Sequence, residues 1–107
     1  MTGFDLHDLE QRVRDRAKAS ADVSYTRQLL DRGVDHCAKK LGEEAIETVL
    51  AAVEEDPKRL TAEAADLMYH LLVLLHARGV ALADVEAVLA ERTRQSGLAE
   101  KAGRKRD

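Results

Sequence analysis

Apolar residues recur every three or four positions along most of the chain, which is the spacing of one face of an α-helix. Ser24 and the dipeptide Asp56-Pro57 are typical helix starts. Gly33 and Gly79 can end helices in the left-handed conformation. Together these features predict helices over residues 5–18, 24–33, 34–54, 57–78 and 82–95. No segment alternates apolar and polar residues as a half-buried strand does, so the sequence predicts an all-α bundle of four to five helices.

The helix predicted over residues 57–78 carries apolar side chains around most of its circumference, especially from Leu67 to Leu75. A helix that is apolar nearly all round has to be buried on several sides. With four or five helices available, the simplest arrangement is a bundle completed by a second copy of the chain. We therefore expect a homodimer, the alternative being a monomer in which this helix is central.

Length and composition fit one intracellular domain. The chain has 107 residues, close to a typical domain size of roughly 100–150, and its basic tail covers residues 97–107. Its 17 basic and 20 acidic residues nearly balance, which argues against a nucleic-acid-binding protein. The single cysteine excludes an internal disulfide and fits a reducing compartment. No apolar stretch approaches the roughly 20 residues of a membrane span. We expect a cytoplasmic protein with neither nucleic acid nor membrane as partner.

Two acidic pairs are the candidate chemical groups. Glu44 with Glu47, and Glu63 with Asp66, each have the three-residue spacing that places both carboxylates on one helix face. Because the connection around Asp56 is short, the two helices should pack antiparallel and bring the pairs to similar height. Four converging carboxylates repel one another unless they are protonated or bridged by cations. Oxygen ligands favour a hard ion, and we expect Mg²⁺, with Mn²⁺ as a substitute.

Other interpretations of these acids stay open at this point. Acidic pairs at this spacing also occur on solvated helix faces, and spacing alone does not separate the two cases. A carboxylate di-iron bundle would need glutamate three residues before a histidine, and none of the four histidines has one. His70, near the second pair, is more typical of a half-buried structural histidine than of a ligand.

Several motifs resemble the phosphoribosyl-ATP pyrophosphohydrolase family, within the MazG-like superfamily of all-α nucleoside-triphosphate pyrophosphatases. The superfamily mark is Glu-Glu-x-x-Glu followed by Glu-x-x-Asp. The matching segments are Ser24-Tyr25-Thr26, Leu29-Leu30, Gly33, Lys40, Gly42-Glu43-Glu44-Ala45, Glu47, Glu63-Ala64-Ala65-Asp66-Leu67 and Tyr69-His70-Leu71-Leu72-Val73-Leu74-Leu75. One departure is Ala81, which stands where an N-capping residue is usual and should soften the last helix.

The resemblance implies hydrolysis of phosphoribosyl-ATP to phosphoribosyl-AMP and pyrophosphate, the second step of histidine biosynthesis, by a magnesium-dependent homodimer. It implies that Glu44, Glu47, Glu63 and Asp66 are the catalytic carboxylates and metal ligands. Many relatives carry a fused cyclohydrolase domain. We expect the next step here to belong to a separate phosphoribosyl-AMP cyclohydrolase.

Substrate contacts are expected from five further residues. Lys40 lies one turn before Glu44 and is either an ion-pair partner or a phosphate ligand. Tyr25 and Thr26 are expected to contact the nucleotide or phosphoribosyl part, although Tyr25 also fits a core aromatic. The C-terminal segment resembles that of the family, and we expect two cations there to fold over bound phosphates, namely Lys101 and Arg104.

Two other functions remain as alternatives. The first is a general MazG-like pyrophosphatase that acts on ordinary or damaged nucleoside triphosphates through the same metal site. The second is a non-catalytic helical dimerisation module whose acidic side chains are simply solvated. The enzyme interpretations predict magnesium binding, whereas the dimerisation module predicts none.

Overall fold

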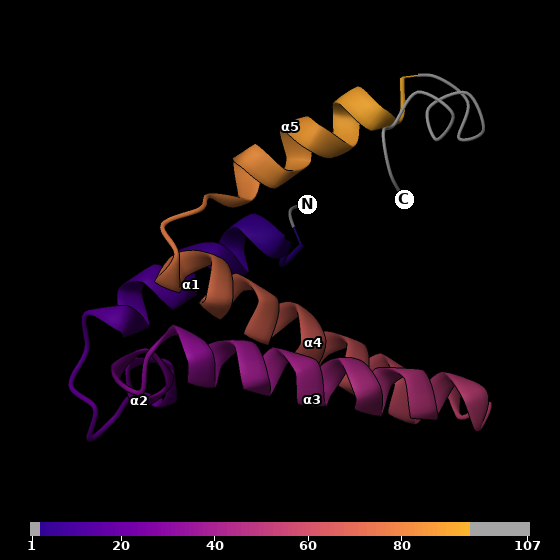
Figure 1. Ribbon diagram of the computed structural model, residues 1–107, viewed down its shortest axis with the longest axis horizontal. Coiled ribbons are helices and arrows are strands. Elements are labelled where there is room, and N and C mark those ends of the chain that lie inside the picture. The colour runs from indigo at the N-terminus through magenta and orange to yellow at the C-terminus, as the bar shows by residue number, and fades with distance from the viewer. Residues whose placement is uncertain (1–2, 95–107) are drawn as a thin grey trace.

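The computed structural model describes residues 3–94, and every regular element in that range is an α-helix (Figure 1). The helices are, in chain order, α1 (Leu6–Ala17), α2 (Tyr25–Asp31), α3 (Val34–Val53), α4 (Pro57–Ala77) and α5 (Leu82–Arg92). The predicted all-α fold is confirmed. None of the helices between residues 3 and 94 combines the length and apolar character that crossing a membrane requires.

Helix boundaries follow the local signals in the sequence. The Ser24 hydroxyl accepts a hydrogen bond from the amide three residues on at 3.0 Å, and the Asp56 carboxylate does the same at 3.1 Å. These bonds satisfy backbone donors that a helix start leaves without partners. Gly33 and Gly79 adopt φ angles of 95° and 71°, a region that favours glycine.

The last helix is shorter than the sequence predicts. α5 ends at Arg92 instead of near residue 95, with Thr93 at the C-cap position. The Thr93 hydroxyl donates to the backbone carbonyl of Leu89 at 2.7 Å. The Thr93 backbone amide donates to the same carbonyl at 3.0 Å, so both donors of Thr93 bond to the final turn of the helix. The predicted end of this helix, residue 95, lies outside the described residues.

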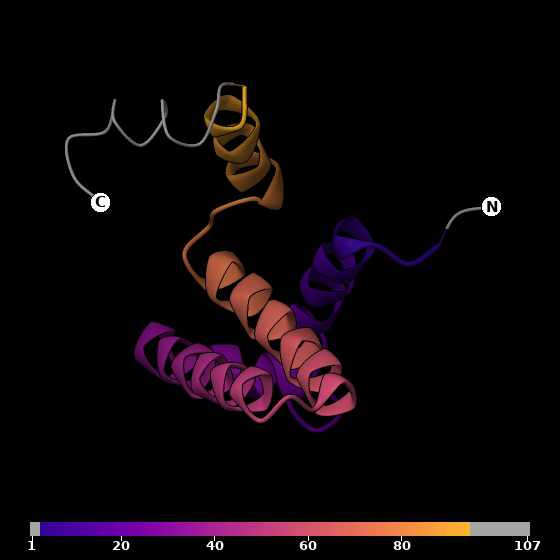
Figure 2. The ribbon, with the colours of Figure 1, turned by 90° about the vertical axis from the view of Figure 1, so that its right-hand side faces the viewer.

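The helices α3 and α4 lie side by side and form the most extensive helix contact in the described part of the chain (Figure 1). The chain reverses direction over residues 54–56, where Glu55 adopts a left-handed φ of 58°. This short connection makes the pair antiparallel. Helices α1 and α2 pack at the end of the pair that lies away from this turn, as both views show (Figures 1 and 2).

The hydrophobic core joins all five helices. Its buried members are Val13, Leu29, Cys37, Leu72, Val73 and Leu82. Each helix contributes at least one of these side chains, so the short helices α2 and α5 are anchored by leucines that are nearly inaccessible to solvent. Burial also raises the pKa of the Cys37 thiol, which disfavours the thiolate form.

A contact from α1 compensates for the missing cap on α5. Ala81 makes no side-chain cap, but the Glu10 carboxylate accepts a hydrogen bond from the Leu82 amide at 2.8 Å. A second link joins His7 to Glu86, with Nε2 2.9 Å from both carboxylate oxygens. The expected softening at Ala81 is therefore offset by a partner more than seventy residues away in sequence.

A large apolar surface stays exposed on the single chain. On α3, Ile46, Val49 and Val53 are 62%, 59% and 73% exposed, and on α4 Met68 and Leu71 are also exposed. Although α4 buries Leu72 and Val73 in the core, the other helices of one chain leave much of its remaining apolar surface uncovered. Large apolar side chains exposed at successive turns of a helix, as Ile46, Val49 and Val53 are on α3, often mark an interaction site.

Candidate active site

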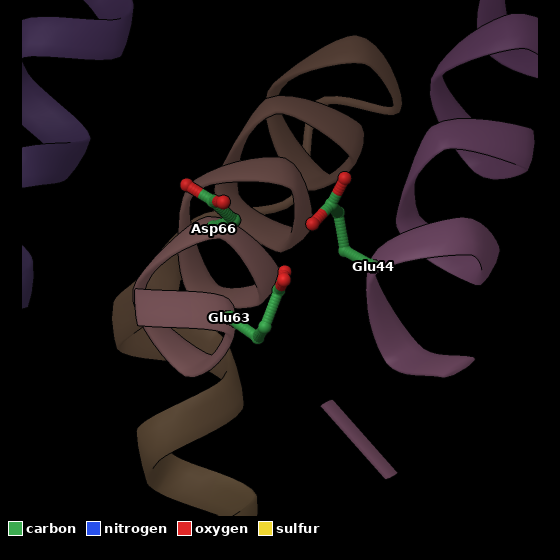
Figure 3. Close-up of side chains that lie close together, drawn as sticks. All are labelled: Glu44, Glu63 and Asp66. Atoms are coloured by element: carbon green, nitrogen blue, oxygen red, sulfur yellow. The ribbon is translucent and has the colours of Figure 1, made fainter. Parts of the chain in front are cut away.

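Three carboxylates from α3 and α4 converge beside the helix pair. One oxygen from each of Glu44, Glu63 and Asp66 lies within 4.8 Å of the others. Figure 3 shows Glu44 reaching from α3 toward α4, with Glu63 and Asp66 on consecutive turns of α4. Glu44 and Glu63 are partly buried, and Asp66 is exposed. The three form a cluster that is open to solvent on one side.

The cluster is electrostatically strained without a cation. Partial burial raises the pKa of Glu63, and the neighbouring charges of Glu44 and Glu47 raise it further. Arg59 acts in the opposite direction but does not cancel the shift. Like charges held this close disfavour ionisation, and a hard divalent ion would relieve the repulsion. The donor set, three carboxylates from adjoining helices, therefore fits such an ion.

Glu47 is the predicted carboxylate that the structure does not bring into this cluster. Arg59 Nη2 donates to Glu47 Oε1 at 3.0 Å, and Arg59 Nε lies 3.9 Å from Glu63 Oε2. The same guanidinium also pairs with Glu54. Arg59 thus holds Glu47 to one side of the three carboxylates. Sequence reasoning missed Arg59, although its position four residues before Glu63 on a helix could have indicated it.

Lys40 was expected to be either an ion-pair partner or a phosphate ligand, and in the structure it forms an ion pair. Its Nζ lies 3.2 Å from Glu43 Oε1, and this partner raises the pKa of the ammonium group. Lys40 and Glu44 are one turn apart on α3, so this cation stands beside the carboxylate cluster. Because Glu43 is itself exposed, the pair is solvated and can exchange partners at low cost.

The aromatic and hydroxyl residues of α2 take different positions. Tyr25 is 53% exposed and meets the buried His70 ring edge to face at 6.5 Å between centroids, so it is available to a ligand. Thr26 is buried, and its hydroxyl lies 2.6 Å from the Tyr69 hydroxyl. Its hydrogen bond therefore joins α2 to α4, and a substrate contact at Thr26 stays a prediction.

Two expected phosphate ligands, Lys101 and Arg104, lie outside residues 3–94. The position of His70 agrees with its interpretation as a structural histidine. Its side chain is buried on α4, and its ring contacts those of Tyr25 on α2 and Tyr69 on α4. Burial lowers the pKa of its imidazole, and the charge of Lys40 lowers it further. A neutral imidazole at this place packs without adding charge to the cluster.

Replacing Glu63 by glutamine should stabilise the metal-free protein near neutral pH. Because the pKa of Glu63 is raised in the folded state, its protonated form stabilises the folded protein at pH values below the unfolded-state pKa, near 4.5. This stabilisation is lost as the pH rises through the folded-state pKa and the carboxyl ionises. The neutral amide avoids this loss. Thermal unfolding with chelator present should give a higher Tm for the variant at pH 7 and equal values at low pH. A lower Tm at pH 7 would mean that the Arg59 contact outweighs the repulsion.

Comparisons with known proteins agree on one family. Residues 6–93 match the profile of the family described as phosphoribosyl-ATP pyrophosphohydrolase. A protein of Nitrobacter winogradskyi named phosphoribosyl-ATP pyrophosphatase is 62% identical over 107 residues, covering all of this chain and 92% of the relative. One from Bradyrhizobium diazoefficiens, named phosphoribosyl-ATP pyrophosphatase 1, is 60% identical over 98% of this chain and 99% of its own. One from Nitrobacter hamburgensis is 58% identical over the whole of both chains.

Proposed function

Because this chain belongs to the phosphoribosyl-ATP pyrophosphohydrolase family, we propose that it hydrolyses phosphoribosyl-ATP to phosphoribosyl-AMP and pyrophosphate in the cytoplasm, as the second step of histidine biosynthesis. The observation that carries the proposal is the convergence of Glu44, Glu63 and Asp66 within the matched region. A general nucleoside-triphosphate pyrophosphatase would use the same cluster and is the second candidate.

The proposed cofactor is Mg²⁺, with Mn²⁺ as a substitute. Glu44, Glu63 and Asp66 would hold it, and Glu47 would join them after leaving Arg59. When bound, the cation supplies positive charge that neutralises the phosphate oxygens around the bond to be broken. Arg59 already supplies positive charge to this region, which supports the view that the acidic group needs a counterion.

The reaction breaks the anhydride between the α and β phosphates. The oxygen of water adds to one of the two phosphorus atoms, the bond from that atom to the bridging oxygen breaks, and phosphoribosyl-AMP and pyrophosphate separate as the water proton is released. The carboxylates would hold the cation beside the reacting end of the substrate, and charge neutralisation should supply most of the rate enhancement. Lys40 would exchange Glu43 for a phosphate oxygen, while Tyr25 presents an exposed ring to the rest of the nucleotide.

The proposed assembly is a homodimer. Ile46, Val49 and Val53 form an exposed apolar stripe on α3, and Met68 and Leu71 add exposed apolar surface on α4. A second copy of the chain offers the same surface, and an isologous contact would cover both. The product would pass to a separate phosphoribosyl-AMP cyclohydrolase.

The decisive assay incubates the protein with phosphoribosyl-ATP, with and without Mg²⁺, and follows pyrophosphate release. We expect release only with the metal, restored by Mn²⁺. A panel of ordinary and damaged nucleoside triphosphates run in parallel separates the two candidates. Equal or higher kcat/KM for one of these nucleotides would favour the general pyrophosphatase, and no release from any substrate would contradict both.

A further inference from the structure

A second pocket, separate from the carboxylate cluster, lies between α2 and the first two turns of α3. Its volume is about 210 Å³. The lining residues are Tyr25, Gln28, Leu29, Arg32, His36 and Lys40. Half of these side chains are basic or can become so, and none is acidic. A concave site with this lining is suited to an anion.

The positive charge in this pocket is poorly compensated. Arg32 makes no ion pair within the described part of the chain, whereas Lys40 is paired with Glu43 at the pocket edge. Burial lowers the pKa of His36, and the charges of Arg32, Lys39 and Lys40 lower it further, with only Glu43 opposing them. A bound anion would relieve this repulsion, and the guanidinium is available to bind it in the bidentate manner that arginine favours.

The pocket stands at a defined distance from the proposed reaction site. Lys40 and His36 are four and eight residues before Glu44 on α3, which corresponds to about 6 and 12 Å along the helix axis. A ligand whose reacting phosphates lie at the carboxylates would therefore place a different part of itself in the pocket. The exposed ring of Tyr25, which also lines the pocket, offers a surface for a sugar or base between the two.

The pocket volume limits the size of what it can hold. About 210 Å³ is below the roughly 300–1,000 Å³ of pockets that enclose whole drug-sized ligands. It suits a fragment such as a phosphorylated sugar. Phosphoribosyl-ATP carries such a fragment at the end remote from its triphosphate, and a phosphate monoester has a charge of about −1.5 to −2 near neutral pH. ATP carries the triphosphate but lacks this phosphate monoester.

We propose that the pocket binds the phosphate monoester of the phosphoribosyl group, and that Arg32 and His36 thereby distinguish phosphoribosyl-ATP from ATP. The inference rests on the proposed function and adds to it two residues that determine substrate specificity. Lys40 lies between the two sites, since it lines the pocket and stands one turn from Glu44.

The test compares Arg32→Gln and His36→Gln with the wild type. For each variant we measure kcat and KM for phosphoribosyl-ATP, and the inhibition constant of ATP as a competitor. We expect KM to rise about tenfold or more, equivalent to about 1.4 kcal/mol of lost binding. Both kcat and the ATP constant should stay within about twofold, since a contact remote from the reacting bond contributes uniform binding.

Lys39→Gln is the matched control. It removes one positive charge from the same helix, but Lys39 is exposed and does not line the pocket. It should leave KM nearly unchanged. The inference is overturned if the KM values of the pocket variants match that of this control. It is also overturned if the variants weaken the binding of ATP as much as the binding of phosphoribosyl-ATP, because the pocket would then bind the triphosphate. Absence of phosphoribosyl-ATP hydrolysis by the wild type would instead overturn the proposed function.

A binding measurement tests the pocket without turnover. Ribose 5-phosphate, added to metal-free protein, should shift the His36 ring resonances in NMR spectra and raise the His36 pKa, because the bound phosphate offsets the charges of Arg32, Lys39 and Lys40. Ribose without the phosphate should cause neither change, and Arg32→Gln should weaken the response. No response of His36 to millimolar ribose 5-phosphate would count against the pocket.

Discussion

Replacing Asp66 by asparagine should abolish turnover, with kcat lowered about 10²–10³-fold or more, which is the loss when one preorganised hydrogen-bond donor to the transition state is removed from an active site. The amide keeps the shape of the side chain but removes the negative charge that a divalent ion needs. Asp66 is exposed and outside the hydrophobic core, so the helices should form as before. The measurements are pyrophosphate release, magnesium affinity by calorimetry and helix content by circular dichroism.

Asp84→Asn is the control for this substitution. Asp84 lies in the first turn of α5, away from the carboxylate cluster, and the variant makes the same chemical change. It should retain wild-type activity and magnesium affinity. Full activity of Asp66→Asn would contradict the assignment of this cluster as the metal and reaction site. Loss of both activity and helix content would call for repeating the test with Glu44→Gln.

Replacing Val49 by glutamate should convert a dimer into monomers. Val49 is 59% exposed in the single chain, so the charge costs little in a monomer. In a symmetric dimer the change occurs twice, and burying unpaired charges costs several kcal/mol. The dissociation constant should therefore rise by about 10³-fold or more. Val49 lies about 140° around the helix from Glu44, so the substitution leaves the carboxylates in place.

Sedimentation at several protein concentrations measures this change. The wild type should sediment with the mass of two chains and the variant with the mass of one. Val23→Glu is the matched control, because Val23 is 82% exposed and lies in the connection between α1 and α2, outside the apolar stripe of α3. A wild-type protein that is monomeric, or a Val49→Glu variant that remains dimeric, would contradict the proposed interface.

Local features of the fold were accessible from the sequence. The caps at Ser24 and Asp56 and the glycines at 33 and 79 act within a few residues, so their effects do not depend on the rest of the chain. The meeting of Glu44 with Glu63 and Asp66 also followed from local information. A short connection fixes antiparallel packing, and residue counting from the turn then sets the relative height of side chains.

Long-range partners were not accessible in this way. Glu10 caps α5 from α1, and Arg59 draws Glu47 away from the other carboxylates. The Thr26 hydroxyl is occupied by Tyr69 of α4. Each of these outcomes depends on which rotamer a side chain adopts once another element is packed beside it. Periodicity specifies the face of a helix but does not specify the direction of a flexible side chain.

The sequence alone determined the helical class, the positions of the helix boundaries within a few residues, and an acidic set with the spacing to face one side of a helix pair. These depend on backbone propensity and on the 3.6-residue repeat, both of which are local. The tertiary structure decided which carboxylates share one space, and it formed the basic pocket from Arg32 at the end of α2 and His36 of α3. That outcome required packing, because the relevant energies arise only between side chains brought together by folding.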